Sequence, residues 1–587
     1  MRKPVFLKMI YAVILTAIFI TSGPYAREVF SDDKPEKHGI STGSLKALSN
    51  LINEYVENER IVGAELAIVK DRHTIYHETF GWKDRDDNLA MQKNSLFNIR
   101  SMTKTITGAA IQILIDEGKL NLKDPAAKYL SGFNNQKSKM ITIEQLLTHH
   151  SGLPLTILTD FTDFEDIQIM TDSIGQRGPK YEPGSTFWYS DAGTDALAAI
   201  VEVVSGKKLE DFVQKRIFDP LGMENTLYFT KRLAYYPDNI VSLHIANQGQ
   251  WTRYWKEGDD PLYNCPWGSQ SIYSTICDYA KFLAMWMDNG RIGESVLLSP
   301  EAVSRTLTPV SRMKTLGMDM LYPTAFPNHA VFHGQLAMLF VDTVKNQTEV
   351  IGYGGSDGTF AWAWPDKDLM ILYFTQSRGQ ATSIGLEAEL YGLFIDTAYF
   401  NKSNVVSNKL APFLGTYAFD DPNLQHTNFG IIAQNNSLAL DIPGQMAYEL
   451  LPLDNEGWCF FKLTNMSGVK FGLDSSGQAA AMLFRQDTPF PLKKGSAASS
   501  ATVSGPRIYI GEYYLPMNQG ILKVILEDEK PVILRPDGIK RILTSTDDPM
   551  IWYIENDPNR KITFQLDDSG RISSMLLTEI TPMHRIK

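Results

Sequence analysis

The stretch Ser101-Met102-Thr103-Lys104 opens an apolar run that continues to a glycine stop signal at Gly118. Apolar residues recur along this run at helical spacing, so the pattern predicts a helix that begins at Ser101. Ser101 and Lys104 are three residues apart and therefore lie on one face of that helix. A base within reach of a serine hydroxyl can take its proton and make it a nucleophile. The start of the helix also offers free backbone N–H groups to a developing oxyanion.

The Ser-x-x-Lys spacing is a weak signal by itself. It also occurs at three other places in the chain, which are Ser205/Lys208, Ser311/Lys314 and Ser467/Lys470. Only Ser101 opens a long apolar helix, so its position selects it. If the pair stood alone, we would interpret Ser101 as a helix cap and Lys104 as a solvated charge.

Further segments accompany the pair in a fixed order. They are residues 146–153 (LLTHHSGL), Pro183-Gly184 followed by Tyr189-Ser190-Asp191, residues 220–223 (PLGM) and Tyr353-Gly354-Gly355. With Ser-x-x-Lys, these segments resemble the signatures of penicillin-binding proteins, class C β-lactamases and related esterases and D-amino-acid peptidases. The resemblance covers residues 41–400 and leaves the last third of the chain outside.

The resemblance implies a role for each matched residue. Ser101 is the expected nucleophile, activated by Lys104, and Tyr189 is the expected phenol that moves the proton between Ser101 and the leaving group. The oxyanion is expected between the backbone N–H groups of Ser101 and Ser356, which follows the third motif. Gly354 and Gly355 of that motif leave room for the backbone to approach the substrate closely.

Two positions depart from the family pattern. Asp191 stands where an Asn is usual, and a carboxylate next to Lys104 could pair with it and weaken it as a base, leaving more of the proton transfer to Tyr189. Tyr353 stands where a cation holds the substrate carboxylate in β-lactamases and carboxypeptidases of the family. We therefore expect an ester, or an amide that lacks this free carboxylate, rather than a penicillin or a D-alanine carboxypeptidase substrate.

The fold class expected for residues 41–400 is α/β, a β-lactamase-like antiparallel sheet packed with helices. A helix is expected from about Ser44, with Ser44 as its N-cap, followed by a hairpin of strands at residues 64–69 and 74–80. Further strands are expected at residues 350–353, 359–364 and 369–374, and a closing helix at residues 384–394.

The chain changes to short alternating runs beyond residue 405, which is typical of all-β structure. Gly415-Thr416-Tyr417 recurs as Gly511-Glu512-Tyr513, so we expect two small lipocalin-like or barrel units at residues 405–490 and 507–587. Residues 491–506, rich in Ser, Ala and Gly, are the expected linker. These units could gate the active site or bind cell-wall material, and D-amino-acid peptidases of the family, which also carry two barrels, favour gating.

Composition and the N-terminus indicate an exported globular protein. The net charge of −11 disfavours a nucleic-acid partner, and no cofactor or metal site is expected from residue spacing. Residues 1–26 combine basic residues, a short apolar run and small residues, so we favour a cleaved signal peptide over a membrane anchor. The expected location is periplasmic or secreted, with possible cell-envelope association. The three cysteines allow at most one disulfide.

These observations predict an exported serine hydrolase that acts through a Ser101 acyl-enzyme on a small ester or peptide amide, as an esterase or D-amino-acid peptidase does. β-Lactamase activity is one alternative. A catalytically silent, penicillin-binding-like sensor is another, and Asp191 and Tyr353 are its support. The sequence leaves open the exact substrate, hydrolysis against acyl transfer, the signal cleavage site, the role of the β units and the oligomeric state.

Overall fold

The computed structural model describes most of the chain from residue 30 onward. The described residues are 30–156, 164–247, 250–314, 322, 324, 326, 328–378, 382–396, 409–419, 428–434, 437–442, 447–461, 464–487, 492–494, 508–514, 521–528, 530–534, 540–555, 557–566 and 572–585. The predicted signal peptide lies outside them, and so does the predicted linker apart from residues 492–494.

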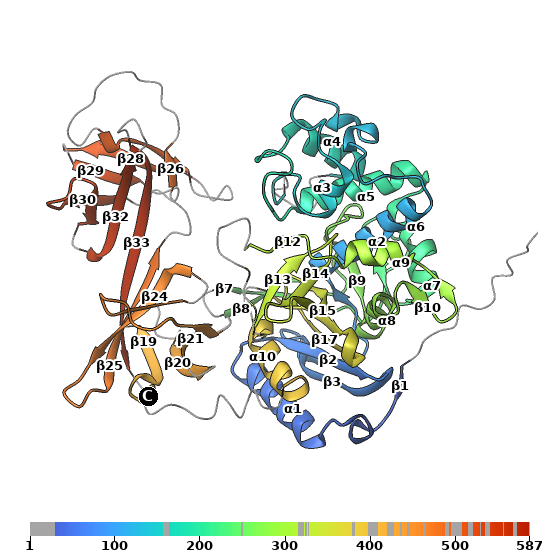
Figure 1. The fold of residues 1–587 in the computed structure, drawn as a ribbon, viewed down its shortest axis with the longest axis horizontal. Helices are drawn as coiled ribbons and strands as arrows, with labels where there is room; N and C mark the ends of the chain where they lie inside the picture. Colours follow the sequence, from blue (N-terminus) through green and yellow to red (C-terminus); the bar gives the residue numbers. More distant parts are fainter. Residues whose placement is uncertain are drawn as a thin grey trace, which may run out of the picture.

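The region before residue 400 is built on one large sheet (Figure 1), in the order β1-β3-β2-β17-β16-β15-β14-β13-β12, with β4 beside β3. Neighbouring strands are antiparallel, except that β1 runs parallel to β3. The predicted hairpin and the three later strands are confirmed. The bounds are β1 (Ser31–Asp32), β2 (Gly63–Lys70), β3 (His73–Asp84), β4 (Leu89–Ala90), β12 (Ser311–Arg312), β13 (His329–His333), β14 (Met338–Asp342), β15 (Gln347–Gly354), β16 (Phe360–Trp364) and β17 (Leu369–Thr375).

Some helices pack against this sheet, and others pack against one another beside it. Helices α1 and α10 lie together, α8 packs on β2, β16 and β17, and α3, α4 and α6 surround α5 (Figure 1). Their apolar faces form one continuous core with the sheet. The bounds are α1 (Thr42–Glu57), α2 (Thr103–Asp116), α3 (Ile143–Leu147), α4 (Ile167–Arg177), α5 (Asp191–Ser205), α6 (Leu209–Val213), α7 (Asp219–Leu221), α8 (Ile276–Met287), α9 (Pro300–Thr306) and α10 (Thr382–Phe394).

Small two- and three-stranded sheets border the large sheet. One of them joins β18, β7 and β8, and another joins β5, β9 and β6. The bounds are β5 (Phe97–Asn98), β6 (Leu227–Tyr228), β7 (Leu243–Asn247), β8 (Gln250–Trp255), β9 (Ile272–Ser274), β10 (Arg291–Ile292), β11 (Ser295–Val296) and β18 (Ser377–Arg378).

Two helix starts differ from those predicted. The N-cap of α1 is Ser41, whose hydroxyl accepts a hydrogen bond from the backbone of Gly43, so the prediction of Ser44 was wrong by one turn. Two serines stand three residues apart here, and the earlier one caps the extra turn. Ser101 lies in a short 3-10 turn, Arg100–Met102, and α2 begins only at Thr103.

The all-β region after residue 410 forms two hydrophobic clusters linked by one long strand. Strand β33 (Ile572–Arg585) pairs with β32 and β26 through its first part and with β25 and β19 through its last part. The last strand of the chain therefore takes part in both all-β units. The other bounds are β19 (Gly415–Phe419), β20 (Phe429–Gln434), β21 (Ser437–Asp441), β22 (Ala447–Glu449), β23 (Trp458–Phe461), β24 (Thr464–Leu473), β25 (Ala479–Asp487), β26 (Leu492–Lys494), β27 (Gly511–Tyr514), β28 (Ile521–Glu527), β29 (Lys530–Leu534), β30 (Lys540–Ser545), β31 (Ile551–Ile554) and β32 (Asp557–Leu566).

Two further predictions concern cysteines and membrane segments. Cys265, Cys277 and Cys459 are all free thiols, so the disulfide that the sequence allowed is not formed. Among the residues that the structure describes, no helix combines the length and the apolarity needed to cross a bilayer.

Candidate active site

The predicted nucleophile and base lie in direct contact at the start of α2. Lys104 Nζ donates a hydrogen bond to Ser101 Oγ at 3.1 Å and another to the backbone carbonyl of Ser269 at 3.2 Å. The Lys104 side chain is completely buried. Such a lysine is positioned to act on the serine hydroxyl and is shielded from competing water.

Asp191 holds the charge of Lys104. Its Oδ1 lies 2.7 Å from Lys104 Nζ, which confirms the pairing expected from the sequence. Burial by itself lowers the pKa of Lys104, but the charge of Asp191 and the neighbouring Tyr189 outweigh it, so the pKa lies above the ordinary value. Lys104 is therefore an ammonium at neutral pH, which cannot accept a proton and acts as an electrostatic stabiliser.

Ser269 and Gln270, which precede α8 in the chain, support the pair formed by Lys104 and Asp191. Gln270 Nε2 donates a hydrogen bond to Asp191 Oδ2 at 3.1 Å, and Ser269 N–H donates one to Asp195 Oδ1 at 2.9 Å. Burial, reinforced by the charge of Asp191, raises the pKa of Asp195 to about 7. Asp195 and Asp191 are one turn apart on α5, so this helix positions both Lys104 and the carbonyl to which it donates.

Tyr189 lies immediately before α5, and the matched segment around His149 holds it there. Ser190 caps α5 through a hydrogen bond from Gly193 N–H, and its backbone N–H donates to His149 Nδ1 at 3.3 Å. The rings of His149 and Tyr189 are 4.6 Å apart, and Lys104 Nζ is 5.0 Å from the centre of the Tyr189 ring. The matched segment predicted that His149 shapes the site by hydrogen bonding, and the bond from Ser190 N–H confirms this. Ser101 and Tyr189 thus flank one ammonium group.

The third motif, Tyr353-Gly354-Gly355, places a buried phenol next to Tyr189. Tyr353 is 1% exposed, and its hydroxyl donates a hydrogen bond to the Tyr189 oxygen at 3.3 Å. The same hydroxyl lies 3.1 Å from His333 Nε2 on the neighbouring part of the sheet. Tyr353 therefore contacts the expected proton carrier itself. His333 was not foreseen, because no spacing in the sequence relates it to Tyr353.

The two glycines of this motif differ in their surroundings. A Cβ atom on Gly355 would lie 2.8 Å from the carbonyl oxygen of Ile99, whereas one on Gly354 would meet nothing closer than 3.6 Å. Gly355 thus lets the end of β15 approach the backbone just before Ser101. Ser356 follows on an exposed turn and accepts a hydrogen bond from Arg378. Its predicted role as an oxyanion donor stays a prediction.

A buried ion pair links this turn to the residue that precedes Ser101. Arg100 Nε donates to Asp357 Oδ2 at 2.8 Å, and both side chains are 1% exposed. Arg100 also donates to the hydroxyls of Tyr263 and Tyr254, and its φ of +47° lies in the left-handed region that a side chain rarely adopts. The residue before Ser101 is therefore fixed by the residue after Ser356.

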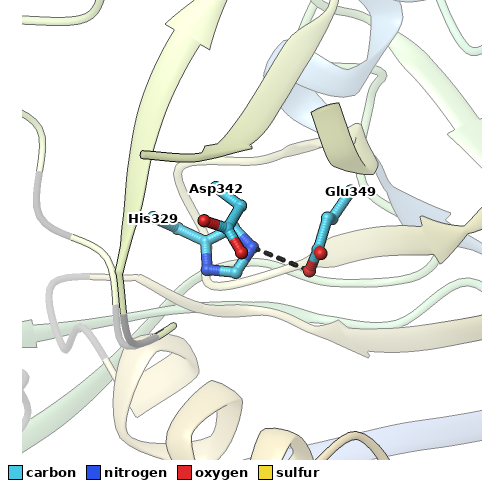
Figure 2. A group of neighbouring side chains, drawn as sticks. All are labelled: His329, Asp342 and Glu349. Carbon is cyan, nitrogen blue, oxygen red and sulfur yellow. Dashed lines mark hydrogen bonds and ion pairs between the residues drawn. The ribbon is translucent and has the colours of Figure 1, made fainter. Parts of the chain in front are cut away.

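Figure 2 shows a separate group that metal-ligand chemistry would suit. His329, Asp342 and Glu349 come from β13, β14 and β15, and their ligand atoms all lie within 4.8 Å of one another. His329 Nε2 is 3.2 Å from Glu349 Oε2, and the ammonium of Lys345 pairs with both carboxylates. The lysine already supplies the positive charge that an ion would bring, so we interpret the group as an ion-pair cluster.

Comparison with known proteins places these observations in a family. A family model described as Beta-lactamase matches residues 48–392. Penicillin-binding protein 4* of Bacillus subtilis (strain 168) is 31% identical over 202 residues, which is 33% of this chain and 44% of that protein.

Two solved structures share the fold. The octameric penicillin-binding protein homologue from Pyrococcus abyssi superposes with a TM-score of 0.53 at 17% identity, over 83% of this chain and 98% of its own. EstCE1, a hydrolase with promiscuous acyltransferase activity, gives a TM-score of 0.50 at 18% identity, over 60% of this chain and 98% of its own.

Proposed function

This chain belongs to the β-lactamase family and is a serine hydrolase, and we propose that it forms an acyl-enzyme at Ser101 with a small ester or peptide amide. The observation that carries the proposal is the 3.1 Å contact between Ser101 Oγ and the buried Lys104. Export of the protein is part of the proposal and is supported by the pattern of residues 1–26.

Acylation follows from the arrangement of three side chains. Because Asp191 keeps Lys104 charged, Tyr189 is the group that takes the proton of Ser101 while Oγ attacks the substrate carbonyl. Tyr189 then gives this proton to the leaving alcohol or amine. In deacylation a water molecule takes the place of the leaving group, and the same proton path runs in reverse.

The developing oxyanion is proposed to bind the N–H groups of Ser101 and Ser356. The close packing of Gly355 against Ile99 and the Arg100–Asp357 pair keep the two segments side by side, which favours fixed donors. The ammonium of Lys104 adds positive charge beside the reacting oxygen. A silent binding protein has no chemical use for this assembled set.

Substrate class follows from what the third motif offers. Tyr353 presents a buried neutral phenol where a cation would bind a carboxylate, which favours esterase or D-amino-acid peptidase activity over β-lactam hydrolysis. This substrate preference is tested with a panel of nitrophenyl esters, D-amino-acid amides and a chromogenic cephalosporin. Turnover of esters or amides that is lost in Ser101→Ala is the expected result. Turnover of the cephalosporin alone would overturn the substrate assignment.

A further inference from the structure

The hydroxyl of Tyr353 has one proton and two neighbours that can accept it. It lies 3.1 Å from His333 Nε2 and 3.3 Å from the Tyr189 oxygen. The third-motif residue is therefore placed between a histidine and the residue that carries the proton in the proposed mechanism. Which neighbour receives the proton depends on the state of each.

The tautomer of His333 can be assigned from its other nitrogen. Nδ1 lies 3.0 Å from the backbone oxygen of Gly334, and a carbonyl can only accept, so Nδ1 carries the hydrogen. His333 is completely buried, and burial lowers its pKa to about 4, which keeps the ring neutral at neutral pH. Its Nε2 is thus a free acceptor that faces the Tyr353 hydroxyl.

The charge on Tyr189 changes during the reaction. When Tyr189 acts as a base its oxygen is negative, and an O–H donor at 3.3 Å then interacts with it strongly. When Tyr189 holds the proton of Ser101, its oxygen is neutral and attracts the donor less. Lys104 stays charged in both states because Asp191 pairs with it.

We propose that Tyr353 and His333 are positioning residues that support Tyr189 through a switching hydrogen bond. Tyr353 donates to the Tyr189 oxygen while that oxygen is anionic, and it donates to His333 Nε2 after Tyr189 has taken the Ser101 proton. No proton leaves Tyr353 in either step. The only proton transferred moves from Ser101 Oγ to Tyr189 and then to the leaving group.

The inference rests on the proposed function. Four variants distinguish a failure of the inference from a failure of the proposed function. Tyr353→Phe removes only the hydroxyl, His333→Leu removes the acceptor, and His333→Gln retains an acceptor near the Nε2 position. Tyr279→Phe is the matched control, since Tyr279 is equally buried and its hydroxyl bonds to Thr105 at 3.0 Å, away from Tyr189. For each protein, kcat and KM for a nitrophenyl ester and the melting temperature are measured.

A hydrogen bond to a charged group corresponds to a rate factor of roughly 10 to 100. We expect Tyr353→Phe to lower kcat by about that factor with KM within about twofold, because the lost hydrogen bond supports the anionic form of Tyr189 that takes the proton and is not a contact with the substrate. His333→Leu should lower kcat by a smaller factor that His333→Gln largely restores. Tyr279→Phe should keep the wild-type kcat.

Two outcomes would overturn the inference. One is an active wild type in which Tyr353→Phe retains kcat within about twofold. The other is an equal loss of kcat in His333→Gln and His333→Leu, which would show that an acceptor at the Nε2 position plays no part. If Tyr353→Phe fails to fold, the two His333 variants decide alone. A wild type that neither turns over esters nor reacts at Ser101 refutes the proposed function itself.

Discussion

Asp191 Oδ1 lies 2.7 Å from Nζ of Lys104, the completely buried lysine that also contacts Ser101, the proposed nucleophile. The pair turns a residue that could act as a base into a fixed positive charge. Tyr189, whose ring centre lies 5.0 Å from the ammonium, is left as the proposed proton carrier.

Replacing Asp191 should change the pH dependence of the reaction. Burial lowers the pKa of Lys104, and the Asp191 charge reverses this effect, so Asp191→Asn should bring the pKa down. Lys104 then loses its proton at lower pH, and kcat/KM should show an added ionisation between about pH 7 and about pH 10. Superimposable profiles of wild type and variant would contradict the assignment. Asp342→Asn, in the ion-pair cluster of Figure 2, is the control.

Asp195 should make the folded protein less stable as pH rises. Its pKa is raised to about 7 in the folded state, against about 4 when unfolded, so the folded state binds the extra proton between these values. Stability is therefore lost from about pH 4 to about pH 7. Asp195→Asn keeps the acceptor for Ser269 and should be more stable than the wild type by about 4 kcal/mol at pH 8 but by little near pH 4, measured by urea unfolding.

Glu387 offers a comparison for this prediction away from the site. Burial raises its pKa to about 8, and its partner is the indole N–H of Trp362. Glu387→Gln should show the same pH-dependent gain with esterase activity unchanged. A gain in Asp195→Asn that is equal at every pH would show that the carboxyl is not protonated in the folded state.

The two ion pairs of Asp357, with the buried Arg100 and with the more exposed Arg378, should contribute different amounts to the free energy of unfolding. Asp357→Asn removes the carboxylate charge that faces the buried guanidinium of Arg100, which should cost about 3 kcal/mol in urea unfolding. The turn that carries Ser356 would also shift, so kcat should fall. Arg378→Gln breaks the 3.1 Å pair between the more exposed Arg378 and Asp357, together with the hydrogen bond to Ser356, and should cost less than about 1 kcal/mol. Equal costs would refute a structural role for the buried pair.

Gly355 and Gly354 should respond differently to alanine. A Cβ on Gly355 would overlap the carbonyl of Ile99, so Gly355→Ala should destabilise the protein by about 1 to 3 kcal/mol. Gly354→Ala has room and should unfold like the wild type, with any loss confined to ester turnover. Thermal melting and ester hydrolysis of both variants check this. A stable, active Gly355→Ala would contradict the close approach.

The sequence predicted the parts of the fold that depend on local pattern. The alternation in residues 359–364 and the helical spacing after Ser101 predicted a strand and a helix, and both elements form, although β16 and most of α2 are buried on all sides. Motif order predicted that Ser101, Lys104 and Tyr189 would meet. The start of α1 was harder, since Ser41 and Ser44 can both cap a helix and only packing selects one.

The supporting residues could not be predicted because their partners are distant in sequence. His333 and Tyr353 are 20 residues apart on strands that are not direct neighbours, and Arg100 and Asp357 are 257 residues apart. A role for Asp195 could have been predicted, since it stands one helical turn after Asp191. No sequence pattern indicates its partner Ser269. The pairing of β33 with strands of both all-β units likewise depends on tertiary structure.

The most direct test of an activated nucleophile is the intact mass of the protein after incubation with a fluorophosphonate, beside Ser101→Ala. Phosphonylation requires a serine hydroxyl whose proton can be taken, which is the property that Lys104 and Tyr189 are proposed to confer. The account predicts one covalent adduct on the wild type and none on Ser101→Ala. An unmodified, folded wild type beside a reactive control enzyme, or an adduct that persists in Ser101→Ala, would contradict it.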